Sequence, residues 1–380
     1  PWLIGDDVTC QDQAFVLLTT VQKQEAHRIA EIIEPLRERD GLQKQIVSLL
    51  LHADLSISRR FFEMVLYGID QGWFDEPHFS QTAQQGTLWV LLQDLPQQQP
   101  MWSCEAIGHL FQHCLEHSIS IEHSNPFDRE SIFPHMSHNT RILLDSAIGA
   151  PMDFIHHVLP FMKNVIHLNT QEKNLLPWQD PIWMPLHRYS RLEDTIKAAL
   201  FFAMETAIST LAQKMPVQFA AIAQFLLEQP FETMHYLLMR GYTANGAVFA
   251  DDAARYLCLP TTRLEIGYRG NTHGATRKLI ETITPFCSPH LLGELEDRLL
   301  HYHPAYERSI KEYKRRLFGL TQLMLLEGIP SAYRSTKVQQ RIAQWRRKFP
   351  QAQFEEPFEA HQLVSVAQFA GNITSPLSPK

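Results

Sequence analysis

Apolar residues recur every three or four positions along most of the chain, and prolines interrupt this pattern at short intervals. Such spacing places apolar side chains on one face of an α-helix. A proline inside a helix removes a backbone donor and clashes with the preceding turn, so each one should end or begin a helix. No alternating segments flank a tight Asn-Gly turn as they would in a β-hairpin. We therefore predict an all-α fold, in which six prolines separate the C-terminal helices: Pro216, Pro230, Pro260, Pro285, Pro304 and Pro330.

The periodic segments are short, and tight turns join them. Helices of this kind bury their apolar faces by pairing with neighbours, which indicates stacked helical hairpins in a HEAT- or TPR-like α-solenoid. The predicted helices are 14–38, 42–54, 58–70, 81–93, 103–118, 139–148, 191–214, 217–228, 231–240, 247–258, 273–284, 289–301, 305–327 and 335–349.

Two segments, 62–73 and 231–242, share the pattern F-E-x3-Y-x4-G followed by an aromatic residue. We expect a helix in each, ended by Gly72 or Gly241 in the left-handed conformation that glycine adopts without strain. The aromatic residue after each glycine should fold back on the last helical turn. This similarity is consistent with a repeated helical unit.

One region breaks the helical rhythm. Residues 167–190 contain three prolines and two tryptophans and have no clear period, so they form either a linker or a long packed loop. We therefore expect a helical half over 1–166, this segment, a second helical half with a basic end over 191–350, and a poorly ordered tail over 351–380.

The composition is that of a globular protein, with 44% hydrophobic and 20% charged residues. The longest unbroken apolar run, 198–204, is far shorter than a membrane helix requires, and no signal peptide opens the chain. Five scattered cysteines without a CxxC pair indicate reduced thiols, and hence the cytoplasm. We expect a segment of a longer protein with no cofactor of its own.

His109, His113 and His117 lie four residues apart. At 100° per residue they fall opposite the apolar face of their helix, so the row should lie on its outer side. Histidines at this spacing can bind zinc, but a catalytic site needs a third ligand and a general base, and HExxH is absent. A metal-dependent hydrolase is therefore kept as an alternative, beside a plain surface row of histidines.

Basic residues gather near the C-terminus. Residues 301–350 carry eleven Lys or Arg against three Glu, although the whole chain has a net charge of −7. Such a segment is either a solvated helix face or a surface for nucleic acid, where Trp345 would stack on a base. The nucleic-acid alternative would use Lys314, Arg315, Arg316, Arg341, Trp345, Arg346, Arg347 and Lys348.

The stretch 248–307 contains "FADDAARYL", "RLEIGY", a threonine-rich helix and "TPFCS", in that order. In this order it resembles the helical C-terminal regions of large bacterial STAND-type NTPases, among them antiviral Avs-like proteins that sense phage components. The resemblance implies that this chain is the ligand-sensing part of a signalling ATPase. In that family a separate P-loop module hydrolyses the nucleotide, and an N-terminal effector kills the cell.

No nucleophile elbow, kinase signature, P-loop or Cys-His signature is found in the sequence, which favours a non-catalytic chain. A helical stack can bind a folded protein by shape, without a pocket. We expect a protein-binding scaffold whose partners are a protein ligand, such as a phage protein, and the other domains of the parent chain. The expected aromatic anchors are Trp73, Trp178, Trp183 and Tyr242.

Overall fold

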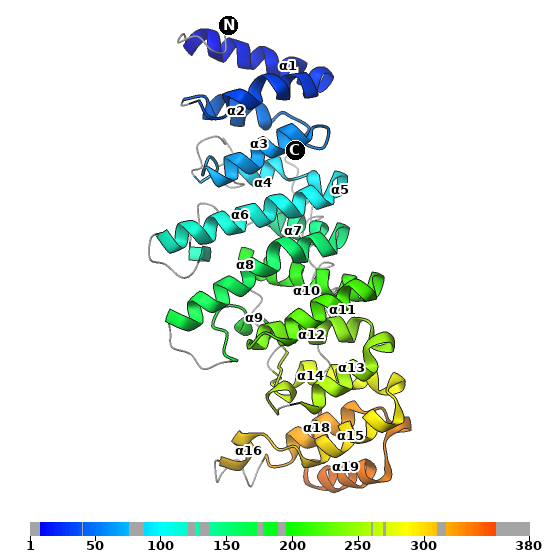
Figure 1. Ribbon diagram of the computed structural model, residues 1–380. Coiled ribbons are helices and arrows are strands. Elements are labelled where there is room, and N and C mark those ends of the chain that lie inside the picture. Colours follow the sequence, from blue (N-terminus) through cyan, green and yellow to red (C-terminus); the bar gives the residue numbers. More distant parts are fainter. Residues whose placement is uncertain are drawn as a thin grey trace, which may run out of the picture. The chain divides into compact units, whose positions relative to one another are not determined.

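A computed structural model describes residues 8–39, 41–75, 87–120, 126–128, 137–172, 178–188, 195–259, 261–268, 271–309 and 317–354. Within these ranges the structure is all-α, as predicted, and only isolated bridges such as Trp178–Phe231 have a β geometry (Figure 1). None of the described helices is long and apolar enough to cross a membrane.

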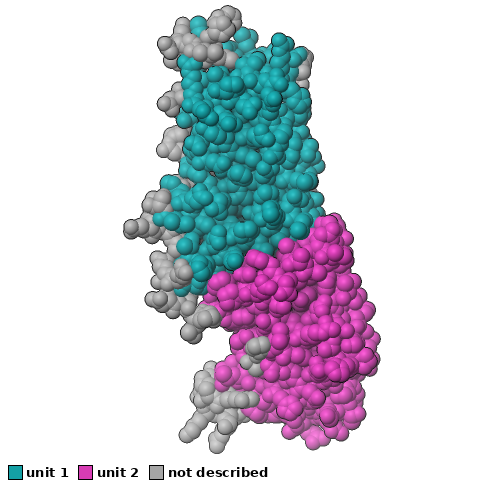
Figure 2. All heavy atoms as spheres, in the orientation of Figure 1, with its two compact units in different colours: residues 1–173, 194–207 teal, residues 174–193, 208–380 magenta. Residues whose placement is uncertain are grey.

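The chain divides into two compact units (Figure 2). Unit 1 comprises residues 1–173 and 194–207, and unit 2 comprises residues 174–193 and 208–380. The described part of the proline- and tryptophan-rich segment, 178–188, is therefore packed within unit 2. Its Trp178 N–H donates to the Pro230 carbonyl at 2.8 Å, and the Trp178 carbonyl accepts from the Glu232 N–H at 3.1 Å. Of the two interpretations of this segment, these bonds favour the packed loop. Most of the tail, 355–380, lies outside the described residues.

Unit 1 is built from helices that pack against helices close to them in sequence. The first packs against the second and third, the third against the sixth, and the sixth against the seventh and eighth. These helices are α1 (Val8–Ile33), α2 (Gln43–Leu50), α3 (Arg59–Asp70), α4 (Thr87–Leu91), α5 (Leu95–Gln98), α6 (Pro100–Ser120), α7 (Ser137–Gly149) and α8 (Pro151–Glu172), and α10 (Ile196–Lys214) spans the division between the units.

Helix α8 is absent from the helices predicted from the sequence, although it has 22 residues. Pro151 stands at its first position, where a proline costs no hydrogen bond. Pro160 lies inside it and leaves the His156 carbonyl without its helical donor. Both Pro160 and His156 are exposed, so water can satisfy that carbonyl. The opposite face of α8, from Phe154 to Val165, is buried.

The packing of α6 on α8 depends on Gly108. A Cβ atom at this position would come within 2.7 Å of the His157 Cβ, so the two helices approach more closely than any larger residue allows. Beside this contact, the Phe111 and Phe161 rings pack with their centroids 5.0 Å apart. The pair α6–α8 thus forms the centre of the unit 1 core.

Unit 2 has the same kind of packing, in which most helices contact one or two of the helices that follow them. The helix predicted over 305–327 is wrong as a single element, because Gly319 has a φ of +90°, which ends the helical path before Leu320. The helices of unit 2 are α9 (Met184–Arg188), α11 (Pro216–Leu227), α12 (Glu232–Ala244), α13 (Gly246–Cys258), α14 (Gly274–Ile283), α15 (Pro289–His301), α16 (Ala305–Ser309), α18 (Leu320–Gly328) and α19 (Thr336–Lys348).

The two similar segments differ in what their glycines do. Gly72 follows α3 with a φ of +71°, and the Trp73 N–H donates back to the Gly68 carbonyl at 2.8 Å, as predicted for a helix cap. The prediction for Gly241 is wrong, because it lies inside α12. A Cβ atom there would come within 2.2 Å of the Phe219 ring, so this glycine permits the close packing of α11 on α12.

Candidate functional site

The histidine row lies on α6, and His109 and His113 pair with different carboxylates. His109 Nδ1 lies 3.0 Å from Asp70 Oδ1, and His113 Nε2 lies 3.1 Å from Asp75 Oδ1. The His113 side chain is only 15% exposed, which corrects the expectation of an outer row, and His117 is half-buried. Nowhere in the described ranges do three His, Cys, Asp or Glu side chains come together as metal ligands. The metal-dependent hydrolase therefore has no supporting geometry in this part of the chain.

Two of the four predicted aromatic anchors belong to the core. Trp183 is fully buried, and Tyr242 is buried against the Phe219 and Phe249 rings. Neither side chain is accessible to a partner, because each fills space between helices, so their prediction as anchors is wrong. Trp73 and Trp178 are half-buried.

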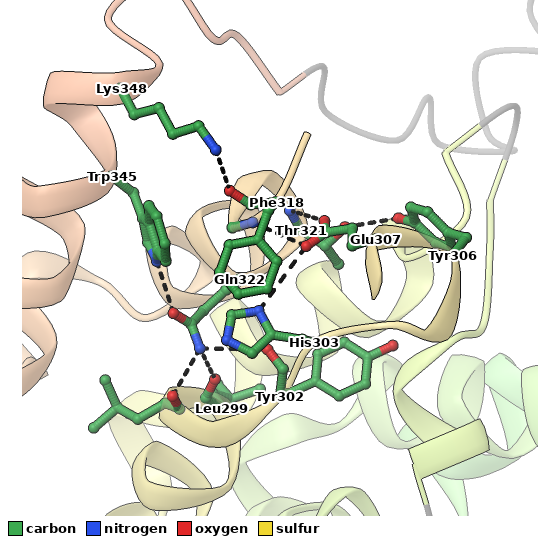
Figure 3. Close-up of polar contacts among 12 residues, drawn as sticks. Leu299, Tyr302, His303, Tyr306, Glu307, Phe318, Thr321, Gln322, Trp345 and Lys348 are labelled. Atoms are coloured by element: carbon green, nitrogen blue, oxygen red, sulfur yellow. Dashed lines mark hydrogen bonds and ion pairs between the residues drawn. The ribbon is translucent and has the colours of Figure 1, made fainter. Parts of the chain in front are cut away.

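The basic C-terminal helix is tied to its neighbours rather than open to a ligand (Figure 3). Trp345 is 8% exposed, and its Nε1–H donates to Gln322 Oε1 at 2.7 Å, so the prediction that it stacks on a base is wrong. Both terminal nitrogens of Arg346 are also engaged, since Nη2 donates to Glu327 and Nη1 to the Ala352 carbonyl. Lys348 Nζ donates to the Phe318 carbonyl at 2.8 Å. Arg341 is half-buried beside Gln322, Arg347 is exposed, and Lys314, Arg315 and Arg316 lie outside the described residues.

Gln322 joins three helices through its side chain (Figure 3). Its Nε2 lies 3.0 Å from the Leu299 carbonyl, 2.7 Å from the Leu300 carbonyl and 3.3 Å from the Tyr302 carbonyl. These groups end α15, where helical carbonyls have no partner of their own. Because Oε1 of the same amide accepts from Trp345, Gln322 links α15 and α19 through α18.

Glu307 caps the start of α18, as Gln322 caps the end of α15 (Figure 3). The carboxylate is fully buried and accepts the Gly319 N–H at 2.9 Å and the Thr321 N–H at 3.0 Å. The positive end of the helix dipole and two unpaired N–H groups make this a favourable place for a negative charge. The close-up therefore shows a structural junction, in which polar side chains complete the ends of helices.

Replacing Trp345 by phenylalanine should lower the free energy of unfolding by about 1 to 3 kcal/mol, since Gln322 Oε1 loses its closest donor inside the core and the smaller phenyl ring leaves part of the indole's space empty. Urea unfolding followed by circular dichroism measures this change. Arg347→Gln, on the exposed face of the same helix, is the control and should cost less than about 0.5 kcal/mol. Equal costs for the two variants would contradict the role given to the indole N–H.

A second set of polar side chains forms hydrogen bonds at the start of α12 in unit 2. Arg188 donates to both oxygens of Glu232 at 2.6 Å, and Glu232 is 1% exposed. Asp180 accepts from the Ile182 and Trp183 N–H groups and from the Thr233 hydroxyl. Burial raises the pKa of both carboxyl groups, while their hydrogen bonds oppose that rise. The sequence analysis did not identify these residues, because their partners lie 44 and 53 positions apart.

A third set of side chains forms a directed chain of hydrogen bonds around the buried Tyr302 and His273. The Tyr302 hydroxyl donates to Glu265 Oε1 at 3.1 Å and lies 2.9 Å from His273 Nε2, which must therefore be the donor to that hydroxyl. Nδ1 of His273 then accepts from the Thr272 hydroxyl at 2.8 Å. Burial raises the pKa of Tyr302, and it lowers that of His273 to about 3. A phenol held neutral is a poor nucleophile, and the hydrogen bonds link the side chains of Glu265, Tyr302, His273 and Thr272 to one another.

Two of the cysteines belong to the core. Cys104 and Cys114 are buried in the unit 1 core, and burial raises the pKa of Cys104 to about 12. A thiol with a raised pKa is a weak nucleophile.

Comparison with known proteins adds no relative: no family model matches the sequence, and searches of curated proteins and of solved structures found no match.

Proposed function

We propose that this chain is a non-catalytic protein-binding scaffold, built as a HEAT- or TPR-like α-solenoid of stacked helical hairpins. The packing order supports the solenoid, because within each unit helices contact those nearest to them in sequence. The buried polar groups support a scaffold, because their geometry ends helices and joins them. The carboxylates Asp180 and Glu307 each accept backbone N–H groups, and Glu232 is held by a guanidinium.

The observation that carries this proposal is the apolar outer face of α1. Phe15 and Ile29 are buried on its inner side, whereas Val16 is 64% exposed, Leu17 56% and Val21 44%. Leu17 and Val21 are four residues apart and therefore neighbours on the helix surface. A helix that is apolar on both sides is normally covered on both sides, and exposed apolar patches mark interaction surfaces. We infer that a folded protein ligand covers this face.

The resemblance of residues 248–307 supports a more specific form of the proposal. These residues include α13, α14 and α15, which agrees with the helical region that the resemblance implies. In this form the chain is the sensor of a cytoplasmic bacterial STAND-type signalling ATPase, its ligand is a phage protein, and nucleotide hydrolysis belongs to another module.

Replacing Leu17 and Val21 together by glutamate should weaken binding of the ligand at least about tenfold, because each side chain loses the gain from apolar burial and places a charge in the interface. Proteins from phage-infected bacteria that bind the chain would be identified, purified and titrated against it by calorimetry. Val217→Glu is the matched control, since Val217 is 82% exposed on α11 in unit 2. Its affinity should equal that of the unchanged chain.

Two results would overturn the proposal. One is that no purified phage protein binds the chain. The other is that the double variant binds as tightly as the control while both keep the same helical circular dichroism signal.

A further inference from the structure

In unit 2, Tyr256 and two side chains that contact its ring have buried polar atoms for which no described residue supplies a hydrogen-bond partner. They are Nδ1 of His235, the hydroxyl of Tyr256 and Nη1 of Arg263. The His235 and Tyr256 rings stack with centroids 5.8 Å apart, and the Arg263 guanidinium carbon lies 4.8 Å from the Tyr256 ring centroid. Tyr256 and His235 are each 2% exposed. We call these three residues the Tyr256 cluster.

Buried polar atoms of this kind require an explanation, because leaving one unpaired costs about 1 to 3 kcal/mol. Three such atoms in side chains that touch one another are difficult to reconcile with a purely structural role. Other side chains of unit 2, such as Thr276, Arg277 and Arg298, also have a buried polar atom that no described residue pairs. Within the described part of unit 2, ring contacts join three such side chains in the Tyr256 cluster. The Tyr256 cluster therefore has the character of a binding site.

The chemistry of the ligand follows from what each atom can do. Nε2 of His235 lies 2.8 Å from the Gln229 carbonyl, and a carbonyl only accepts, so Nε2 carries the proton. Burial lowers the pKa of His235 to about 4, which leaves Nδ1 as a bare acceptor at neutral pH. Arg263 is a permanent donor, and the Tyr256 hydroxyl is a donor as well. The ligand must therefore present acceptors to two groups and a proton to the third.

The charges around the cluster favour an anion. Glu232, the buried carboxylate that acts on Tyr256, is already neutralised by the two hydrogen bonds from Arg188. Asp252, which acts on the neighbouring Tyr242, pairs with Arg255 at 2.8 Å. Among the described residues, no carboxylate is recorded in an ion pair with Arg263, whose positive charge therefore remains to be balanced.

Trp178 holds one side of the cluster in place. Its ring lies 4.6 Å from that of His235 and tilts by 30°. Its φ of +86° is a left-handed conformation that costs a non-glycine residue about 1 to 3 kcal/mol. Backbone bonds to Pro230 and Glu232 maintain this conformation. Strain of this kind is commonly found beside binding sites.

We propose that the Tyr256 cluster binds a protonated oxyanion of the hydrogen phosphate class. Its unprotonated oxygens accept from Arg263 and Tyr256, and its P–O–H group donates to Nδ1 of His235. Sulfate has a similar size and shape but carries no proton at neutral pH, so it cannot make the third bond.

The test is a titration of the full chain with inorganic phosphate at neutral pH, followed by calorimetry and by the thermal midpoint. We expect saturable binding that raises the midpoint, as any ligand specific for the folded state does. Sulfate at the same ionic strength should bind at least about tenfold more weakly, since it leaves the imidazole nitrogen unpaired. This comparison needs no variant.

Two variants complete the test. Tyr256→Phe removes a buried hydroxyl without a protein partner, so without phosphate the variant should be at least as stable as the unchanged chain, and its phosphate affinity should fall about tenfold. Arg263→Gln should lower the affinity by at least as much. Arg255→Gln, which alters the exposed pair with Asp252, is the matched control and should bind normally. If phosphate does not bind, water alone forms hydrogen bonds with these atoms. If all three variants bind phosphate equally well, the ion binds elsewhere. Either result overturns the proposal.

Discussion

Replacing Arg188 by methionine should lower the free energy of unfolding of the chain by about 3 to 5 kcal/mol, measured by urea unfolding at neutral pH. Arg188 makes both of its short bonds to Glu232, whose side chain is 1% exposed. Without the guanidinium, a carboxylate is left in the core with no opposite charge beside it. The methionine keeps most of the apolar stem, so the loss reports on the charge.

The matched control is the double variant Arg188→Met with Glu232→Met. It removes both charges, and buried ion pairs replaced by apolar residues of similar size often cost little. The double variant should therefore recover most of the stability lost in the single one. If it is as unstable as Arg188→Met, the stabilisation comes from the packing of these side chains and not from their pairing.

Acid should destabilise the chain well before ordinary carboxylates titrate. Three histidines of unit 2 are buried and neutral: burial lowers the pKa of His187 to about 3, of His273 to about 3 and of His235 to about 4. In the unfolded chain each returns to a pKa near 6.5. Between about pH 6.5 and pH 4 the unfolded state therefore binds more protons than the folded state, and stability falls as the pH falls.

Each of these histidines contributes a slope of about 1.4 kcal/mol per pH unit over this window, so the three together give about 4 kcal/mol per pH unit. Asp180 and Glu232 act in the opposite direction, because burial raises their pKa values and the folded state then binds protons that the unfolded state has released. Their effect offsets part of the loss as the pH falls. The thermal midpoint measured from pH 7 to pH 5 should still fall steeply.

His187→Phe tests the assignment. The imidazole of His187 stacks on the Tyr236 ring with centroids 4.4 Å apart, so a phenyl ring can take its place. In the variant, the slope of the free energy of unfolding against pH should be smaller by about 1.4 kcal/mol per pH unit, whatever its stability at pH 7. An unchanged slope would mean that His187 does not titrate on unfolding.

The all-α class was predictable because helical periodicity is a local property, and most predicted segments overlap a helix. The predictions that failed depended on contacts with distant parts of the chain. Pro160 resembles a helix end until the exposed side of α8 is known, and Gly241 resembles a cap until Phe219 is placed against it. Pairing of Arg188 with Glu232 has no local signal at all.

Trp345 is a different case, because the sequence did contain the signal. Val338, Ile342 and Trp345 lie at i, i+4 and i+7 on one face of α19, and all three are buried. This apolar face predicts that Trp345 is buried. The basic residues beside it had instead suggested that the indole stacks on a nucleic-acid base. The order of the helices can thus be predicted from the sequence, whereas the hydrogen-bond partners of buried polar groups are known only from the structure.

The division between the two units falls between Ala207 and Ile208, inside the continuous helix α10, and residues 174–193 already belong to the second unit. The polypeptide thus passes from one unit to the other three times. No single cut can release either unit as an intact fragment: a truncation after Lys173 discards the part of α10 that completes unit 1, and a later cut carries along a piece of unit 2. Expressing one half alone therefore requires two stretches of chain to be joined by an artificial connection.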